Sequence, residues 1–161
     1  MKLYLLFIFP LLTLVISGCS TLTDFLPSVQ TLTPSGGTFT SDAVITGGSS
    51  STLTVPANAV YAPTALTFSV VTSVPSPPNN ATLLAAYSFS ATSATSFLLP
   101  ATLQITYGAN SVFATNYSSI QLYLLNNGSW QLLNGTTLNA ANFSITNSNV
   151  ITLGTYAVFA S

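Results

Sequence analysis

The chain has 161 residues, with one basic side chain, two acidic side chains and no histidine, so only 2% of its residues are charged. Soluble domains usually carry about 25% charged residues. Nucleic-acid binding requires cations, a zinc site requires several Cys, His or carboxylate ligands, and triad hydrolysis requires a base. We therefore expect no nucleic-acid partner, no metal or other cofactor, and no catalytic residues, so that the protein is not an enzyme.

The first eighteen residues have the pattern of a secretory signal. Lys2 supplies a positive charge, and an almost wholly apolar segment follows at 3–16. About fourteen residues of helix span roughly 21 Å, which is less than the ~30 Å hydrocarbon core of a bilayer. The pattern therefore favours a signal segment over a membrane-spanning helix.

The apolar segment leads to Cys19, the only cysteine of the chain, through the sequence LVISGC at 14–19. This string resembles a bacterial lipobox, in which the bond between Gly18 and Cys19 is cleaved and fatty acids such as palmitate are attached to the cysteine. The resemblance implies removal of residues 1–18 and a membrane partner reached through the lipid on Cys19. Ser20 resembles an outer-membrane sorting signal, so we expect a lipid-anchored protein of the cell envelope, in the outer membrane or at the cell surface. A plain secretory signal with a chance cysteine is the alternative.

Residues 19–35 are polar, contain prolines and lack a steady period, so they predict a lipidated tether. From residue 36 to residue 161 the chain has the length of one domain and contains short alternating polar and apolar runs. No helical stretch of useful length interrupts them. The pattern predicts an all-β domain, a single antiparallel β-sandwich of about eight or nine strands. The runs lie at 38–40, 52–55, 66–70, 87–89, 103–107, 120–124, 130–132, 143–145 and 156–158.

Turn residues separate the later runs. Asn127-Gly128 predicts a two-residue hairpin, because both residues tolerate positive φ, and Asn134-Gly135 predicts a second tight turn. The proline-rich stretch 74–80 cannot lie inside a sheet and predicts an exposed loop. Trp130, just past the hairpin turn, is expected to pack in the sandwich core with its N–H bonded to a backbone carbonyl. A surface position for sugar stacking is the alternative.

Several motifs, taken in order, resemble a ZU-five domain, the domain type shared by zonula occludens proteins, netrin receptors and ankyrins. The resemblance covers about residues 34–160 and implies a β-sandwich. The matching segments are GGTFTS at 36–41, LTVPANAV at 53–60, TALTF at 64–68, LPATLQI at 99–105, GSWQLL at 128–133 and TYAV at 155–158.

Some ZU-five relatives cleave themselves at a His-Phe-Ser sequence just before the closing strand. Alignment on the closing strand places Thr152, Leu153 and Gly154 at that position, where both the base and the nucleophile are missing. The resemblance therefore implies a degenerate self-cleavage position. The nearby sequence Asn142-Phe143-Ser144 imitates the motif one strand too early, and we interpret it as a strand with Phe143 inward.

These observations predict a lipid-anchored, non-catalytic envelope protein whose β-sandwich is a structural or protein-interaction module. Its expected partners are the membrane and an unknown envelope protein or glycan, with self-association through a sheet edge that few charges protect. The alternative is a small carbohydrate- or ligand-binding surface domain, in which an exposed Tyr or Trp130 stacks on sugar. An exposed aromatic row would favour that alternative, and a buried Trp130 would favour the structural module.

Overall fold

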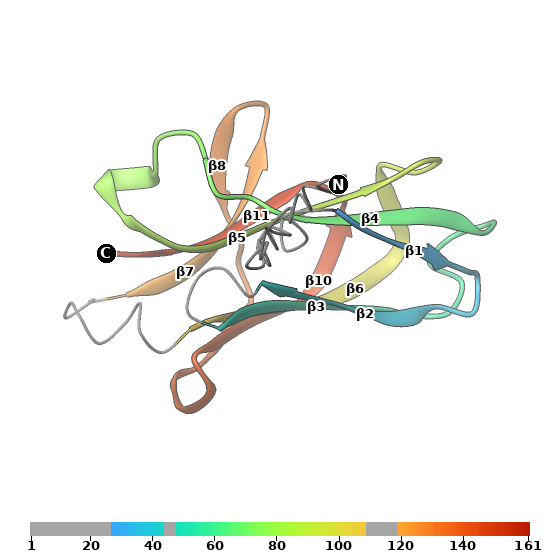
Figure 1. Ribbon diagram of the computed structural model, residues 1–161, viewed down its shortest axis with the longest axis horizontal. Helices are drawn as coiled ribbons and strands as arrows, with labels where there is room; N and C mark the ends of the chain where they lie inside the picture. The colour runs from blue at the N-terminus through green and yellow to red at the C-terminus, as the bar shows by residue number, and fades with distance from the viewer. Residues whose placement is uncertain (1–26, 44–47, 109–118) are drawn as a thin grey trace, which may run out of the picture.

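The computed structural model describes residues 27–43, 48–108 and 119–161. In these ranges eleven β-strands and no α-helix occur, and the strands form two antiparallel sheets that pack face to face (Figure 1). The predicted all-β antiparallel sandwich is confirmed. The strand count differs from the predicted eight or nine, because short strands without clear alternation escaped the sequence pattern.

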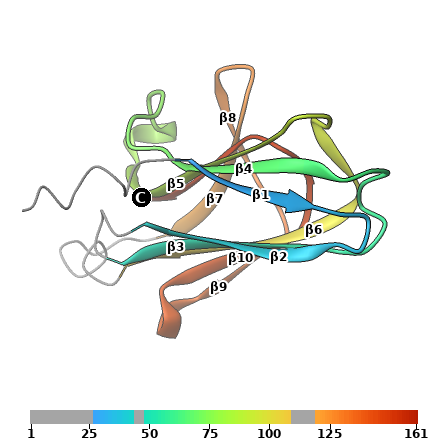
Figure 2. The same cartoon turned by 45° about the vertical axis from the view of Figure 1, so that its right-hand side comes forward.

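The larger sheet has six strands and the smaller sheet has five, and Figure 2 shows them as two layers. The order in the larger sheet is β1 (Ser28–Leu32), β4 (Thr64–Val70), β5 (Thr82–Ala91), β11 (Thr155–Ala160), β7 (Ile120–Asn126) and β8 (Ser129–Leu132). The order in the smaller sheet is β2 (Gly37–Ala43), β3 (Ser49–Val55), β6 (Ser96–Tyr107), β10 (Ser144–Thr152) and β9 (Thr136–Asn139).

The core lies between the two sheets and contains a row of aromatic rings. Phe39 of the smaller sheet lies 5.9 Å from Phe68 of the larger sheet, measured between ring centroids. The row continues from Phe68 to Phe89 at 5.2 Å and from Phe89 to Tyr156 at 5.9 Å, both with edge-to-face geometry. Alternation along the strands points these side chains inward, so the hydrophobic effect and ring contacts stabilise the sandwich together.

The predicted tether at 19–35 extends too far along the chain. β1 lies within it and pairs with β4, from Ser28 opposite Phe68 to Leu32 opposite Thr64. Leu32 is fully buried. The sequence pattern did not reveal this strand for two reasons. Prolines flank it on both sides, and a five-residue edge strand has too few residues for a clear period. The sandwich therefore includes residues before 36.

Trp130 packs outside the sandwich core, contrary to the prediction. Ala86, Ala157 and Phe159 form a second buried cluster, which alternation places on the outer face of the larger sheet. The Trp130 ring lies 5.0 Å from that of Phe159 and is partly buried against this cluster. Its Nε1 donates a hydrogen bond to the Pro75 carbonyl at 3.3 Å. This carbonyl is the kind of backbone partner that the sequence predicted for the Trp130 N–H.

The proline-rich loop takes part in this outer cluster. Val71, Val74 and Ala81 pack against it, and a 3-10 turn at Pro78–Asn80 lies within the loop, beside β8 in Figure 1. The loop is outside the sheets, as predicted, but part of it covers the larger sheet instead of projecting into solvent.

Three turns lie at or near the positions that the sequence predicts. Asn127 and Gly128, with φ values of 49° and 78°, form the predicted hairpin between β7 and β8. The predicted turn at Asn134-Gly135 connects β8 in one sheet to β9 in the other.

Phe143 does not lie in a strand, contrary to the prediction. It has a φ of 49° after the 3-10 turn Ala140–Asn142, and its ring lies 6.4 Å from that of Tyr107. The Asn139 side chain accepts a hydrogen bond from the Asn142 N–H and so caps the 3-10 turn, and the Phe143 carbonyl accepts one from the Tyr107 N–H at 2.9 Å.

Candidate functional site

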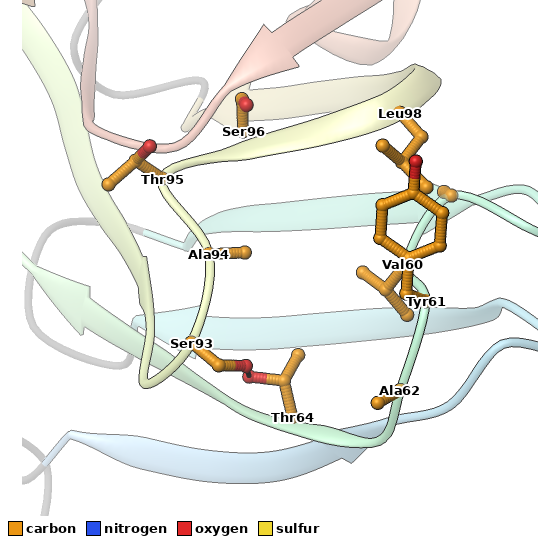
Figure 3. A pocket seen from close by; sticks show the side chains of 10 residues that line it. Val60, Tyr61, Ala62, Thr64, Ser93, Ala94, Thr95, Ser96 and Leu98 are labelled. Atoms are coloured by element: carbon orange, nitrogen blue, oxygen red, sulfur yellow. Dashed lines mark hydrogen bonds between the residues drawn. The ribbon is translucent and has the colours of Figure 1, made fainter.

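An open pocket lies where the corner after β3 meets the connection between β5 and β6 (Figure 3). Its volume of about 430 Å³ falls within the ~300–1,000 Å³ typical of ligand sites. Tyr61 and Leu98 lie on one side of it, and Ser93 and Thr95 on the other. The lining residues are Ala59, Val60, Tyr61, Ala62, Thr64, Ser93, Ala94, Thr95, Ser96 and Leu98.

Backbone hydrogen bonds fix both walls of this pocket. The Leu98 N–H donates to the Ala59 carbonyl at 2.9 Å and so joins the two walls directly. The Leu153 N–H donates to the Thr95 carbonyl at 2.9 Å, which ties the far wall to the turn between β10 and β11. Val60 and Phe97 are buried in the core beneath the walls. The pocket is therefore largely formed before any ligand arrives.

Hydroxyl groups line one part of the pocket. The Ser93 hydroxyl donates to the Thr64 Oγ1 at 2.8 Å, and the Thr64 Oγ1 lies 3.2 Å from the Thr92 Oγ1. Thr64 is buried, whereas Ser93, Thr95 and Ser96 are exposed. Each hydroxyl can donate one hydrogen bond and accept others, so this surface can bond a polar ligand without charge.

Tyr61 stands at the rim of the pocket with 89% of its surface exposed. It follows the buried Val60 in the short segment that ends at Pro63. The sequence interpretation missed Tyr61 because it lies between strands, where alternation carries no information. The available signal was a tyrosine among the turn residues Asn58 and Pro63.

The predicted degenerate self-cleavage position forms the tight turn between β10 and β11. The Phe89 N–H donates to the Gly154 carbonyl at 2.9 Å, and the Tyr156 hydroxyl donates to the Thr152 carbonyl. Burial raises the pKa of Tyr156 to about 12. Together with the bond from Leu153 to Thr95, these contacts give the turn a supporting role at the pocket wall.

The other predicted site residues, Gly18 and Cys19, lie outside the described residues. Within residues 27–43, 48–108 and 119–161 there is no group of three or more His, Cys, Asp or Glu side chains. In the same ranges, none of the helical segments has the length and apolar character needed to span a bilayer.

Compared with known proteins, the chain matches no protein-family model and no curated protein. The resemblance to ZU-five domains and to lipoproteins therefore stays a prediction from the sequence motifs.

Proposed function

We propose that the protein is a lipid-anchored, non-catalytic module of the cell envelope that acts through structural or protein-binding contacts. The observation that carries this proposal is the short apolar segment ending in LVISGC at 14–19, followed closely by a β-sandwich. Two or more acyl chains on Cys19 would hold such a domain stably at a membrane, whereas one chain would hold it weakly.

The chemistry of the pocket supports binding over catalysis. Its lining consists of aliphatic side chains, hydroxyls and one phenol, and it includes no carboxylate, imidazole or amine. A serine or threonine hydroxyl becomes a nucleophile when a neighbouring base accepts its proton. In this pocket the hydroxyls of Ser93, Thr64 and Thr92 contact one another instead.

The sheet edges support a role in contacts between proteins. β1 and β8 are the edges of the larger sheet, and β2 and β9 are the edges of the smaller one. Val29, Leu132 and Leu138 are exposed on three of these strands. Charged side chains normally protect such edges from pairing, and β1, β8 and β9 contain none. A second copy of the chain or another envelope protein could pair there.

Metabolic labelling tests the anchor. The full chain is produced in a bacterium that processes lipoproteins, supplied with an alkyne-tagged palmitate, and its N-terminal peptide is analysed by mass spectrometry. We expect label on Cys19, no residues before it, and protein in the membrane fraction. Cys19→Ser should lose the label and the membrane association, whereas Ser17→Ala, which keeps a small residue near the cleavage point, should retain both.

Unlabelled Cys19, or an N-terminus that still begins at Met1, would refute the anchor. Native mass spectrometry of the solubilised protein then tests the interaction role. A purely monomeric protein that recovers no envelope protein after cross-linking would contradict it.

A further inference from the structure

Tyr61 differs from the other tyrosines of the described residues. Tyr87, Tyr107 and Tyr156 are buried in the core, and Tyr123 is partly buried against Phe159. Tyr61 is 89% exposed and lies beside the pocket. An exposed ring of this size forgoes the stabilisation that burial would give it. Its position at the rim of a cavity, next to the buried Val60, suits a ring that stacks on a ligand.

The space beside Tyr61 is open because small side chains border it. Ala62 and Ala94 contribute one methyl group each, on opposite walls of the pocket (Figure 3). Leu98, which is 47% exposed, adds an apolar surface on the Tyr61 side. The opposite side carries the linked hydroxyls of Ser93 and Thr64, which can still accept hydrogen bonds, and the hydroxyl of Ser96 lies in the same wall. The pocket thus has an aromatic and aliphatic side that faces a hydroxyl side.

The apolar side and the hydroxyl side of the pocket together indicate the class of ligand that it can bind. An ionic ligand would be desolvated in the pocket without a charged partner, which is unfavourable. An apolar peptide segment would remove the exposed hydroxyls of Ser93 and Ser96 from water and leave their remaining hydrogen-bonding capacity unused, which also costs free energy. A neutral sugar ring has both an apolar C–H face and a rim of hydroxyls, and it satisfies both sides.

We propose that the pocket between residues 59–64 and 93–98 binds a neutral saccharide unit. The sugar ring stacks on Tyr61 and Leu98, and its hydroxyl groups exchange hydrogen bonds with Ser93, Thr64 and Ser96. The inference does not depend on the lipid anchor, because all of these residues belong to the folded sandwich.

Binding of defined sugars to the purified full-length protein tests this inference. The detergent must lack a sugar head group, since such a head group would compete for the pocket. The probes are cellobiose, maltose, lactose and N,N′-diacetylchitobiose at up to about 10 mM, a concentration that detects millimolar affinity. Saturation-transfer NMR reports contact with the sugar protons, and calorimetry reports the affinity.

We expect at least one disaccharide to bind and its ring C–H protons to show the strongest saturation transfer. Tyr61→Ala should weaken its binding about tenfold or more, equivalent to the loss of about 1.4 kcal/mol. Tyr61→Phe should retain the affinity within about threefold, because the stacking face remains. Ala62→Trp should block the pocket. Leu138→Ala is the matched control, because Leu138 is another exposed apolar side chain, 46% exposed, on β9 away from the pocket.

The inference is overturned if none of the four disaccharides binds, or if Tyr61→Ala leaves the affinity unchanged while the variant remains folded. Should Tyr61→Ala fail to fold, Ala62→Trp decides, and undiminished binding by that variant has the same consequence. Cross-linking of the Tyr61 rim to a protein, with no sugar bound, also overturns it. A labelled Cys19 without sugar binding refutes this inference alone, and an unlabelled Cys19 refutes the proposed anchor alone.

Discussion

The replacement of Gly36 by alanine should destabilise the sandwich by more than the loss of one flexible residue explains. Gly36 precedes β2 with a φ of 75°, and its N–H donates to the Thr33 carbonyl at 2.9 Å. An added Cβ would lie 2.4 Å from the Val55 carbonyl oxygen and 2.7 Å from the Pro56 carbonyl carbon. Both are backbone atoms, so the whole corner after β3 would have to move.

The magnitude follows from three contributions. The left-handed conformation costs a residue with a Cβ about 1–2 kcal/mol. Overpacking against atoms that cannot rotate away costs about 1–3 kcal/mol more. The alanine also lowers the conformational entropy of the unfolded chain, which stabilises the folded state by about 0.4–1 kcal/mol. Gly36→Ala should therefore lower the free energy of unfolding by about 1–5 kcal/mol, with about 3 kcal/mol as the central value.

Gly135→Ala is the matched control. Gly135 also has a positive φ, 71°, but nothing lies within 4 Å of an added Cβ. Gly135→Ala should therefore lower the free energy of unfolding by only about 1 kcal/mol, because only the left-handed backbone conformation penalises it. Urea unfolding followed by Trp130 fluorescence and circular dichroism measures both variants, with equal m-values required. Equal losses for the two variants would refute the argument that the close approach to Val55 and Pro56 matters.

Two further predictions concern buried hydroxyls. Burial raises the pKa of Tyr156 from 10.0 to about 12, and that of Tyr107 in the same direction. The unfolded chain therefore releases these protons first as the pH rises, so stability should fall between pH 10 and pH 12, by about 3 kcal/mol for Tyr156, and level off above. Denaturant unfolding across this range checks the fall, which should be shallower in Tyr156→Phe; an equal slope would contradict the assignment. The Ser51 hydroxyl is buried without a partner, so Ser51→Ala should leave stability unchanged or raise it by up to about 1 kcal/mol. Thr64→Val, which loses contacts with Ser93 and Thr92, should instead lower it by about 1 kcal/mol in the same assay. A loss in Ser51→Ala as large as that in Thr64→Val would mean that the Ser51 hydroxyl is bonded.

The parts of the fold that alternation predicted are the strands with one face toward the core. β3 is such a strand, with Leu53 and Val55 inward and Thr54 outward. The first half of β5 was not predicted, because four successive residues in it are buried and do not alternate: Leu84, Ala85, Ala86 and Tyr87. A strand covered on both faces loses its period, and the loop carrying Val74 supplies the second cover.

The candidate site was harder to predict than the fold. Tyr61 lies in a corner whose shape depends on contacts with residues far along the chain, including the bond from Leu98 to Ala59. Trp130 was placed on the wrong side of its sheet because the period of a strand does not say which of two covered faces a residue occupies. Local sequence carries neither kind of information.

The central position of β11 has a consequence for the order of folding. β11 pairs with β5 on one side and β7 on the other, yet it is the last strand along the described chain. Until residues 155–160 are available, the larger sheet consists of two separate halves whose inner edges have nothing to pair with. Closure of this sheet therefore awaits contacts between residues far apart in sequence, which slows folding. A nascent chain would therefore keep the inner edges of β5 and β7 unpaired until β11 emerged.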